Sequence, residues 1–102
     1  MSEVLRYLDE AYLEIASLDE LAARFFLSKY HLCRAFKEST GMSLWDYVIW
    51  RRLLHFNECT KTGESLEDAC RAAGFVNYSN FDRLYRKHFG ITPRQFRAKL
   101  EK

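Results

Sequence analysis

The sequence predicts an all-α fold of about seven helices, arranged as two helix-turn-helix subdomains joined by a central linker helix. Apolar residues recur at helical spacing, and no stretch alternates convincingly with the period of two that is typical of strands. The same short pattern also occurs twice along the chain. With 102 residues and 48% hydrophobic content, the chain can build the core of one compact domain.

Capping residues divide the chain into segments of helical length. Ser17-Leu18-Asp19-Glu20 has the order of a capping box, in which the serine and glutamate side chains bond free backbone amides. Ser65-Leu66-Glu67-Asp68 opens a second short helix, which Gly74 ends. Pro93 takes a first helical position, where its missing N–H costs nothing. The expected helices cover about residues 4–15, 18–25, 28–40, 43–60, 65–73, 77–89 and 93 onward.

The two halves of the chain match each other. The first short-helix motif returns 48 residues later, and after one extra residue near Val76 the shift becomes 49. Caps, inner aromatic residues, outward basic residues and glycine stops all match, so chance similarity of two helical hairpins explains the repeat poorly. The matching pairs are Leu32 and Phe81, Arg34 and Arg83, Phe36 and Tyr85, Lys37 and Arg86, and Gly41 and Gly90. The apolar members, together with Phe89, are expected in the core.

Each repeat has the plan of a helix-turn-helix unit: a short helix, a tight turn and a second helix with a basic outer face. In this plan the second helix enters the major groove of DNA. Side chains at i, i+3, i+4 and i+7 project into the groove together. The outward stripe comprises Tyr30, Cys33, Arg34 and Lys37 in the first repeat, and Ser79, Asp82, Arg83 and Arg86 in the second.

The side chains on and beside these stripes suit DNA chemically. Arginine can bond guanine bidentately, and asparagine can bond adenine in the same way. Basic residues further along each helix, and the free amides at each helix N-terminus, suit phosphates. Phosphate contacts are therefore expected from Ser28, Lys29, Lys37, Asn77, Arg86 and Lys87.

The histidines and cysteines do not predict a metal site. His31 and Cys33 are two residues apart on one helix and so diverge, and no cysteine pair has the spacing of a zinc site. No catalytic Ser-His-Asp or Cys-His set, glycine-rich phosphate loop or carboxylate pair is visible. We expect no enzyme activity, no cofactor and no metal, and small core positions for Cys59 and Cys70.

Two long motifs extend the repeat. The first is Leu27-Ser28-Lys29-Tyr30-His31-Leu32-x-Arg34-x-Phe36-Lys37, and the second is Ser79-Asn80-Phe81-x-Arg83-x-Tyr85-Arg86-Lys87-x-Phe89-Gly90-x-Thr92-Pro93-x-x-Phe96-Arg97. Over nearly the whole chain, the sequence resembles the DNA-binding domain of AraC/XylS-type regulators. The resemblance implies activation or repression of bacterial transcription, with double-stranded promoter DNA and RNA polymerase as partners. It places the base-contacting positions at Tyr30, Cys33, Arg34, Ser79, Asn80 and Arg83.

Three residues depart from that family or complicate its chemistry. Phe26 stands where the family usually has glycine, and because a bulky residue resists positive φ, we expect a distorted first turn. Cys33 is short and a weak donor, so the first unit is expected to discriminate less between bases. Asp82 repels phosphate; it either holds Arg83 in place or accepts from a cytosine amino group.

The expected organisation is one DNA-binding domain over residues 1–102. It comprises a first unit at 1–42, a linker helix at 43–62 and a second unit at 63–102. A linker helix of about 17 residues is roughly 26 Å long, against roughly 34 Å between successive major grooves. With the reach of both units and some DNA bending, a monomer would occupy adjacent grooves of an asymmetric site.

Charge and cysteine usage set the cellular context. The first 20 residues carry a net charge of −5, which leaves +7 on the other 82. This fits an acidic cap on a basic surface, and equally an ordinary solvated helix. No apolar run is long enough to span a bilayer, no secretion signal is visible, and three cysteines are an odd number. We expect a soluble cytoplasmic protein without a membrane partner.

The competing interpretation is a helical protein-interaction module whose basic faces are merely solvated. The repeated outward Arg and Lys residues argue against it, and a salt-dependent DNA affinity would decide between the two. The chain has no room for a ligand-sensing domain, so no small-molecule ligand is expected in this segment. Because little sequence precedes the first helix, we expect a fragment of a longer regulator rather than a stand-alone one.

Overall fold

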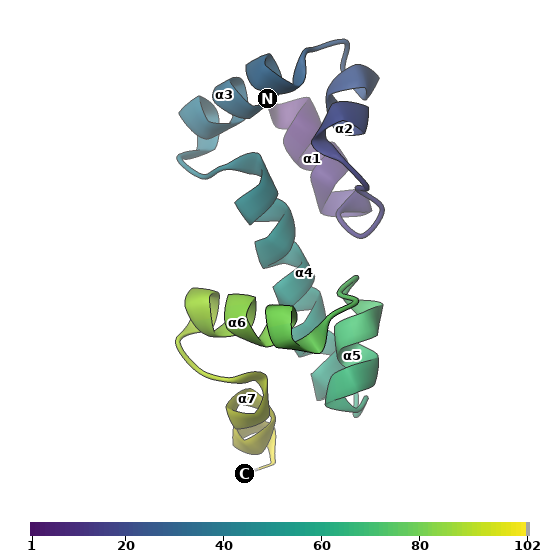
Figure 1. Ribbon diagram of the computed structural model, residues 1–102, viewed down its shortest axis with the longest axis vertical. Helices are drawn as coiled ribbons and strands as arrows, with labels where there is room; N and C mark the ends of the chain where they lie inside the picture. The colour runs from purple at the N-terminus through teal and green to yellow at the C-terminus, as the bar shows by residue number, and fades with distance from the viewer. Residues whose placement is uncertain (102) are drawn as a thin grey trace. The chain divides into compact units, whose positions relative to one another are not determined.

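The computed structural model describes residues 1–101 and confirms the all-α prediction (Figure 1). Seven helices and no strand lie within that range. Six of the seven agree with the expected bounds to within one or two residues. The helices are α1 (Ser2–Ala11), α2 (Leu18–Arg24), α3 (Lys29–Thr40), α4 (Leu44–Lys61), α5 (Leu66–Ala72), α6 (Tyr78–Phe89) and α7 (Pro93–Leu100).

The first helix is shorter at its C-terminal end than its apolar periodicity predicts. It ends at Ala11, and the Glu14 amide then donates to the Ala11 carbonyl at 2.9 Å in a turn. Ile15 is nevertheless buried, because the turn directs it into the same core. Apolar spacing therefore marked the buried face correctly but not the end of the helix.

The predicted caps position both long helices of the repeats. The Ser28 hydroxyl accepts from the His31 amide at 3.1 Å, and the Asn77 side chain accepts from the Asn80 amide at 2.9 Å. At the other end of each helix, Gly41 and Gly90 have φ values of 79° and 75° and close the helix in the left-handed conformation. The box before α7 is complete, with bonds of 3.0 and 2.8 Å between Thr92 and Gln95.

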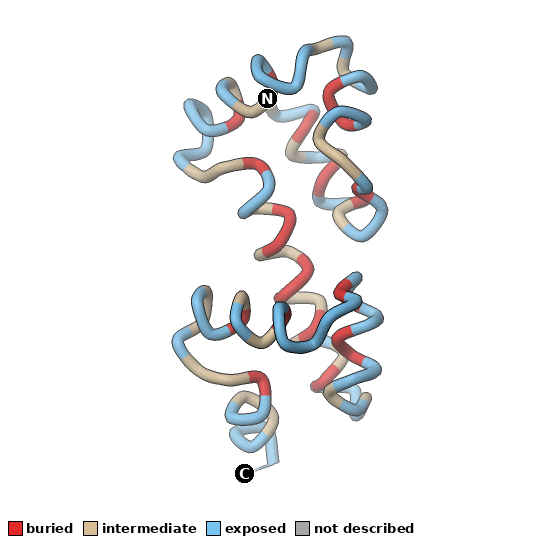
Figure 2. The backbone as a smooth tube through the Cα atoms, in the orientation of Figure 1, coloured by how far each residue is buried: buried red, intermediate tan, exposed pale blue. Residues whose placement is uncertain are grey.

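The chain divides into two compact units, Met1–Arg51 and Arg52–Lys102, and α4 contributes residues to both. In the first unit, α2 packs against α3, whose buried residues are Leu32 and Phe36. Figure 2 shows buried and exposed stretches along the same helix. The core of this unit comprises Val4, Leu8, Ile15, Leu21, Ala22, Leu32, Phe36, Leu44 and Val48.

The core of the second unit is an aromatic cluster. The Phe81 ring centroid lies 4.6 Å from that of Phe56 and 5.1 Å from that of Phe75. Tyr85 extends the cluster to Phe89, with 4.7 Å between their ring centroids. Phe81 and Tyr85 are buried as expected, whereas Phe89 is only half-buried at the edge of the cluster. These contacts fix the inner face of α6 and so determine which of its side chains face outward.

Polar groups in this unit respond to the same burial. The Tyr85 hydroxyl donates to Asn57 Oδ1 at 2.6 Å, and burial raises the pKa of Tyr85 to about 12. Cys70 is buried as expected, but Cys59 is half-buried. Desolvation, together with nearby Glu64, raises the pKa of Cys59 to about 11.

The expectation that Phe26 distorts the first turn is wrong. Phe26 itself adopts a left-handed conformation with φ 57°, and Gly74 takes the equivalent place in the second turn with φ 91°. In both turns the next amide donates to the carbonyl five residues back, at 2.9 Å from Leu27 and 3.1 Å from Phe75. The Phe26 side chain is 95% exposed, so its ring meets no packing obstacle. Backbone hydrogen bonds therefore impose the same turn on both sequences.

Candidate nucleic-acid interface

The outer face of α3 gathers the residues predicted for the first unit. Because Leu32 and Phe36 hold the opposite face in the core, Tyr30, Arg34 and Lys37 are directed outward. Arg34 and Lys37 are exposed, and the Tyr30 side chain is 73% exposed. Ser28 and Lys29 are exposed at the N-terminus of the helix, whereas Cys33 is half-buried.

Beside this face lies a groove with a volume of about 750 Å³. Five of the predicted residues line it, together with the first residue of α2 and the N-cap of α4. Leu18, Glu38 and Ser43 were missed by the sequence reasoning. The residues that line the groove are Leu18, Lys29, Tyr30, Cys33, Arg34, Lys37, Glu38 and Ser43.

The outer face of α6 gathers the corresponding residues of the second unit. The burial of Phe81 and Tyr85 on the inner face leaves the predicted positions at the surface. Six predicted residues are exposed here: Asn77, Ser79, Asn80, Arg83, Arg86 and Lys87. Asn77 is at once the N-cap of the helix, so its side chain is already bonded to a backbone amide.

Asp82 does not hold Arg83, which was one of its two expected roles; the cytosine contact stays a prediction. Asp82 pairs with Arg86 at 3.1 Å, one turn further along the helix. Arg83 instead donates to Asn80 Oδ1 at 2.5 Å, so two of the predicted base-contacting residues are bonded to each other. The Asn80 carbonyl therefore orients the Arg83 guanidinium.

A second groove, with a volume of about 500 Å³, lies beside α6. Three of its lining residues, Ser79, Asp82 and Arg86, lie 49 positions after Tyr30, Cys33 and Lys37, which line the first groove. The same shift relates Thr92, the N-cap of α7, to Ser43, so it identifies residues that motif reasoning missed. The lining residues are Tyr78, Ser79, Asp82, Arg86, Thr92 and Arg94.

The two grooves differ in chemistry although they are equivalent in position. On the stripe, the first groove presents an aromatic ring and a thiol, Tyr30 and Cys33. The second presents a hydroxyl and a carboxylate, Ser79 and Asp82. Both have basic side chains along the same side of the helix, which suits a polyanion.

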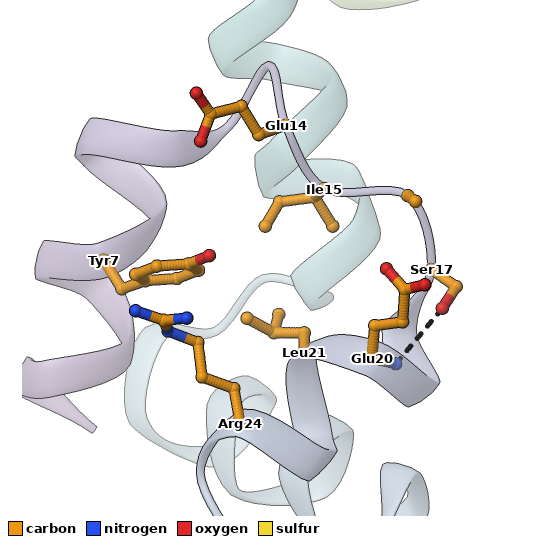
Figure 3. A pocket seen from close by; sticks show the side chains of 8 residues that line it. Tyr7, Glu14, Ile15, Ser17, Glu20, Leu21 and Arg24 are labelled. Carbon is orange, nitrogen blue, oxygen red and sulfur yellow. Dashed lines mark hydrogen bonds between the residues drawn. The ribbon is translucent and has the colours of Figure 1, made fainter.

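A further pocket, of about 170 Å³, lies between α1, the turn after it and α2 (Figure 3). Its lining includes Glu14 and Glu20, and the Arg24 guanidinium lies 4.3 Å from the centre of the Tyr7 ring. None of the predicted DNA-contacting residues lines it. Within residues 1–101, no three His, Cys, Asp or Glu side chains are grouped to hold a metal ion. No described helix is both long and apolar enough to cross a membrane.

Two copies of a short capped helix, a tight turn and a longer helix with a basic outer face define a helix-turn-helix protein. Comparison with known proteins agrees. A family model described as a helix-turn-helix domain matches residues 21–99. The probable transcription factor PqrA of Proteus vulgaris is 33% identical over 100 residues, which cover 95% of this chain and 82% of PqrA.

Solved structures match over almost the whole chain. A regulator from Chromobacterium violaceum, described as having an AraC-type DNA-binding domain, superposes with a TM-score of 0.86 at 29% identity. That match covers 99% of this chain and 91% of the other. The DNA-binding domain of AdpA, solved with a target DNA, gives 0.85 at 25% identity, over 96% and 89% of the chains. The chain belongs to the AraC/XylS-type helix-turn-helix family of DNA-binding transcription regulators.

Proposed function

We propose that the chain binds double-stranded promoter DNA with α3 and α6 as its recognition helices, each in a major groove. The observation that carries the proposal is the pair of exposed, basic stripes, each fixed by a buried inner face. The AdpA complex supports DNA as the ligand of this fold. Bases would be contacted by Tyr30, Cys33, Arg34, Ser79, Asn80 and Arg83, and phosphates by Ser28, Lys29, Lys37, Asn77, Arg86 and Lys87.

The proposed division of labour follows the repeat. Residues 1–42 form the first DNA-contacting unit, 43–62 the linker helix and 63–102 the second unit. A monomer would occupy two adjacent major grooves of an asymmetric site. The protein acts on transcription together with RNA polymerase in the cytoplasm, without catalysing a reaction and without a small-molecule ligand in this segment.

Salt dependence of DNA binding tests the electrostatic part of this proposal. Four of the proposed phosphate contacts are cationic, namely Lys29, Lys37, Arg86 and Lys87. Four neutralised phosphates predict that log affinity falls against log salt with a slope of about −3.6. Lys37→Ala and Lys87→Ala should each reduce the steepness by about one, for every DNA sequence alike. Lys99→Ala, near the C-terminal end of α7 and outside both grooves, serves as the matched control and should leave the slope unchanged.

Hydroxyl-radical footprinting tests the two-groove arrangement. The expected result is protection in two regions about one helical turn of DNA apart, on one face of the duplex. Protection confined to a single groove would contradict the proposal that both units bind at once. Absence of any salt-dependent DNA binding would contradict the proposed function as a whole.

A further inference from the structure

The first groove has an apolar character that hydrogen-bonding readout does not explain. It is lined on the α2 side by Leu18 and on the stripe by Tyr30 and Cys33. The Tyr30 side chain is 73% exposed. Together these three side chains give the groove an apolar lining beside the proposed binding face, which suits contact with an apolar group.

The charges around this groove indicate which molecule supplies that group. Lys29 and Lys37 lie along the same helix, and Arg34 forms only an exposed pair with Glu38 at 3.5 Å. An exposed pair of this kind is weak, so Arg34 remains free to change partners. A polyanion that also carries an apolar substituent fits this surface, and in the major groove of DNA that substituent is the C5-methyl group of thymine.

The second groove also has an aromatic residue, Tyr78, in its lining, but its two stripe positions carry polar side chains. Ser79 and Asp82 occupy the positions equivalent to Tyr30 and Cys33, and Asp82 is held by Arg86. Hydroxyl and carboxylate groups gain nothing from a methyl group. The backbone geometry of the two units is the same, so the difference lies in the side chains.

We infer that the first unit recognises thymine through its C5-methyl group, with the Tyr30 ring and the Cys33 side chain as the contacting surface. This inference rests on the proposed function and names the base that its first half-site contains. The second unit discriminates bases by hydrogen bonds, with Arg83 oriented by Asn80. The Cys33 thiol is a weak hydrogen-bond donor, and this is no disadvantage here because recognition of a methyl group needs no donor.

The magnitude follows from the area that one methyl group removes from water. Burial of one CH₂-sized group corresponds to about a fourfold change in affinity. Replacement of thymine by deoxyuridine removes only the methyl group and leaves every hydrogen-bonding atom in place. The substitution therefore separates methyl contact from all other readout.

The experiment begins with a site selected from random DNA. The half-site of the first unit is the one whose selected bases change in Arg34→Ala, and the other is the one that changes in Arg83→Ala. Each thymine is then replaced singly by deoxyuridine, and affinity is measured by titration. We expect about fourfold weaker binding at one or two thymines of the first half-site and no change in the second.

Variants assign the effect to the two side chains. Tyr30→Phe should keep the fourfold difference between thymine and deoxyuridine, whereas Tyr30→Ser should abolish it. Cys33→Ala should retain most of it and Cys33→Ser should reduce it, with Lys99→Ala, outside both grooves, as the control. Melting curves verify that each variant is folded.

Two results overturn the inference while leaving the proposed function intact: a first half-site without thymine, or binding that deoxyuridine does not weaken. An unchanged deoxyuridine effect in Tyr30→Ser and Cys33→Ser also overturns it, because the methyl contact would then lie elsewhere. Failure to bind any DNA overturns the proposed function, and the inference with it.

Discussion

Replacing Phe26 by glycine should stabilise the protein. Phe26 has φ 57° in the turn between α2 and α3, and the left-handed conformation costs an L-residue roughly 1–2 kcal/mol. Glycine removes that cost but loses roughly 0.5–1 kcal/mol more conformational entropy on folding. Because the side chain is 95% exposed, little burial is lost with the ring. The net gain is about 0.5–1 kcal/mol.

The second turn supplies the opposite experiment. Gly74 has φ 91°, and a Cβ placed there would lie 3.6 Å from side-chain atoms of Arg52, which is an ordinary contact distance. Gly74→Ala should therefore lose about 0.5–1 kcal/mol through backbone strain rather than through a clash. Phe26→Ala keeps the Cβ and the strain, so its stability should remain close to that of the parent protein.

Thermal and urea unfolding followed by circular dichroism measure all three variants. A change of 0.5–1 kcal/mol shifts the Tm of a chain of this size by about 2–8 °C, upward for Phe26→Gly and downward for Gly74→Ala. An unchanged or lower Tm in Phe26→Gly would refute the reasoning. If Phe26→Ala also lowered the Tm, the exposed ring would have to make stabilising contacts that its exposure does not suggest.

Three further predictions concern the interface and the core. Arg83→Ala should lose about 1–3 kcal/mol of affinity for the preferred site and relax specificity at one base pair, measured with cognate and scrambled duplexes; equal losses on both would make Arg83 a phosphate contact. Asp82→Asn should strengthen binding to all sequences and steepen the salt slope, because it removes a negative charge and releases Arg86 from its 3.1 Å pair; unchanged salt dependence would count against a phosphate role for Arg86. The free energy of unfolding, measured with urea, should keep its full value below pH 10 and decrease as the pH rises toward 12. Burial raises the pKa of Tyr85 from 10.0 to about 12, so the unfolded phenol loses its proton first; Tyr85→Phe should flatten part of that decline.

The sequence predicts the helices well because their ends depend on local chemistry. Ser28 and Asn77 accept from amides three residues ahead, and a glycine in the left-handed conformation closes each recognition helix. Such contacts lie within four residues along the chain and are visible as a pattern. Core positions such as Phe36 and Tyr85 follow from helical spacing for the same reason.

The turn at Phe26 and the contacts of Asp82 were predicted less well than the helices, because several local interactions compete at each position. The steric preference of Phe26 opposes positive φ, but the backbone hydrogen bonds of the turn outweigh it. Adjacency in the sequence pointed to Arg83 as the protein partner of Asp82, but the geometry of the helix places Arg86, one turn away, in contact with it. The first groove was missed because it needs residues from three parts of the chain, with Leu18 and Ser43 beside α3.

Comparison of the two units distinguishes the residues that the fold requires from those that can differ with the DNA sequence recognised. Caps, left-handed turn residues and buried aromatic positions coincide in the two units, so the backbone of each outward stripe is presented in the same way. The proposed preferences of the two half-sites must then arise from side chains at equivalent stripe positions. The largest of these differences is between Cys33, which is a half-buried thiol, and Asp82, which is an ion-paired carboxylate. A carboxylate repels phosphate and is unfavourable beside a methyl group, whereas a thiol is compatible with both. The exchange of this one pair should therefore alter base preference without altering either turn or either helix.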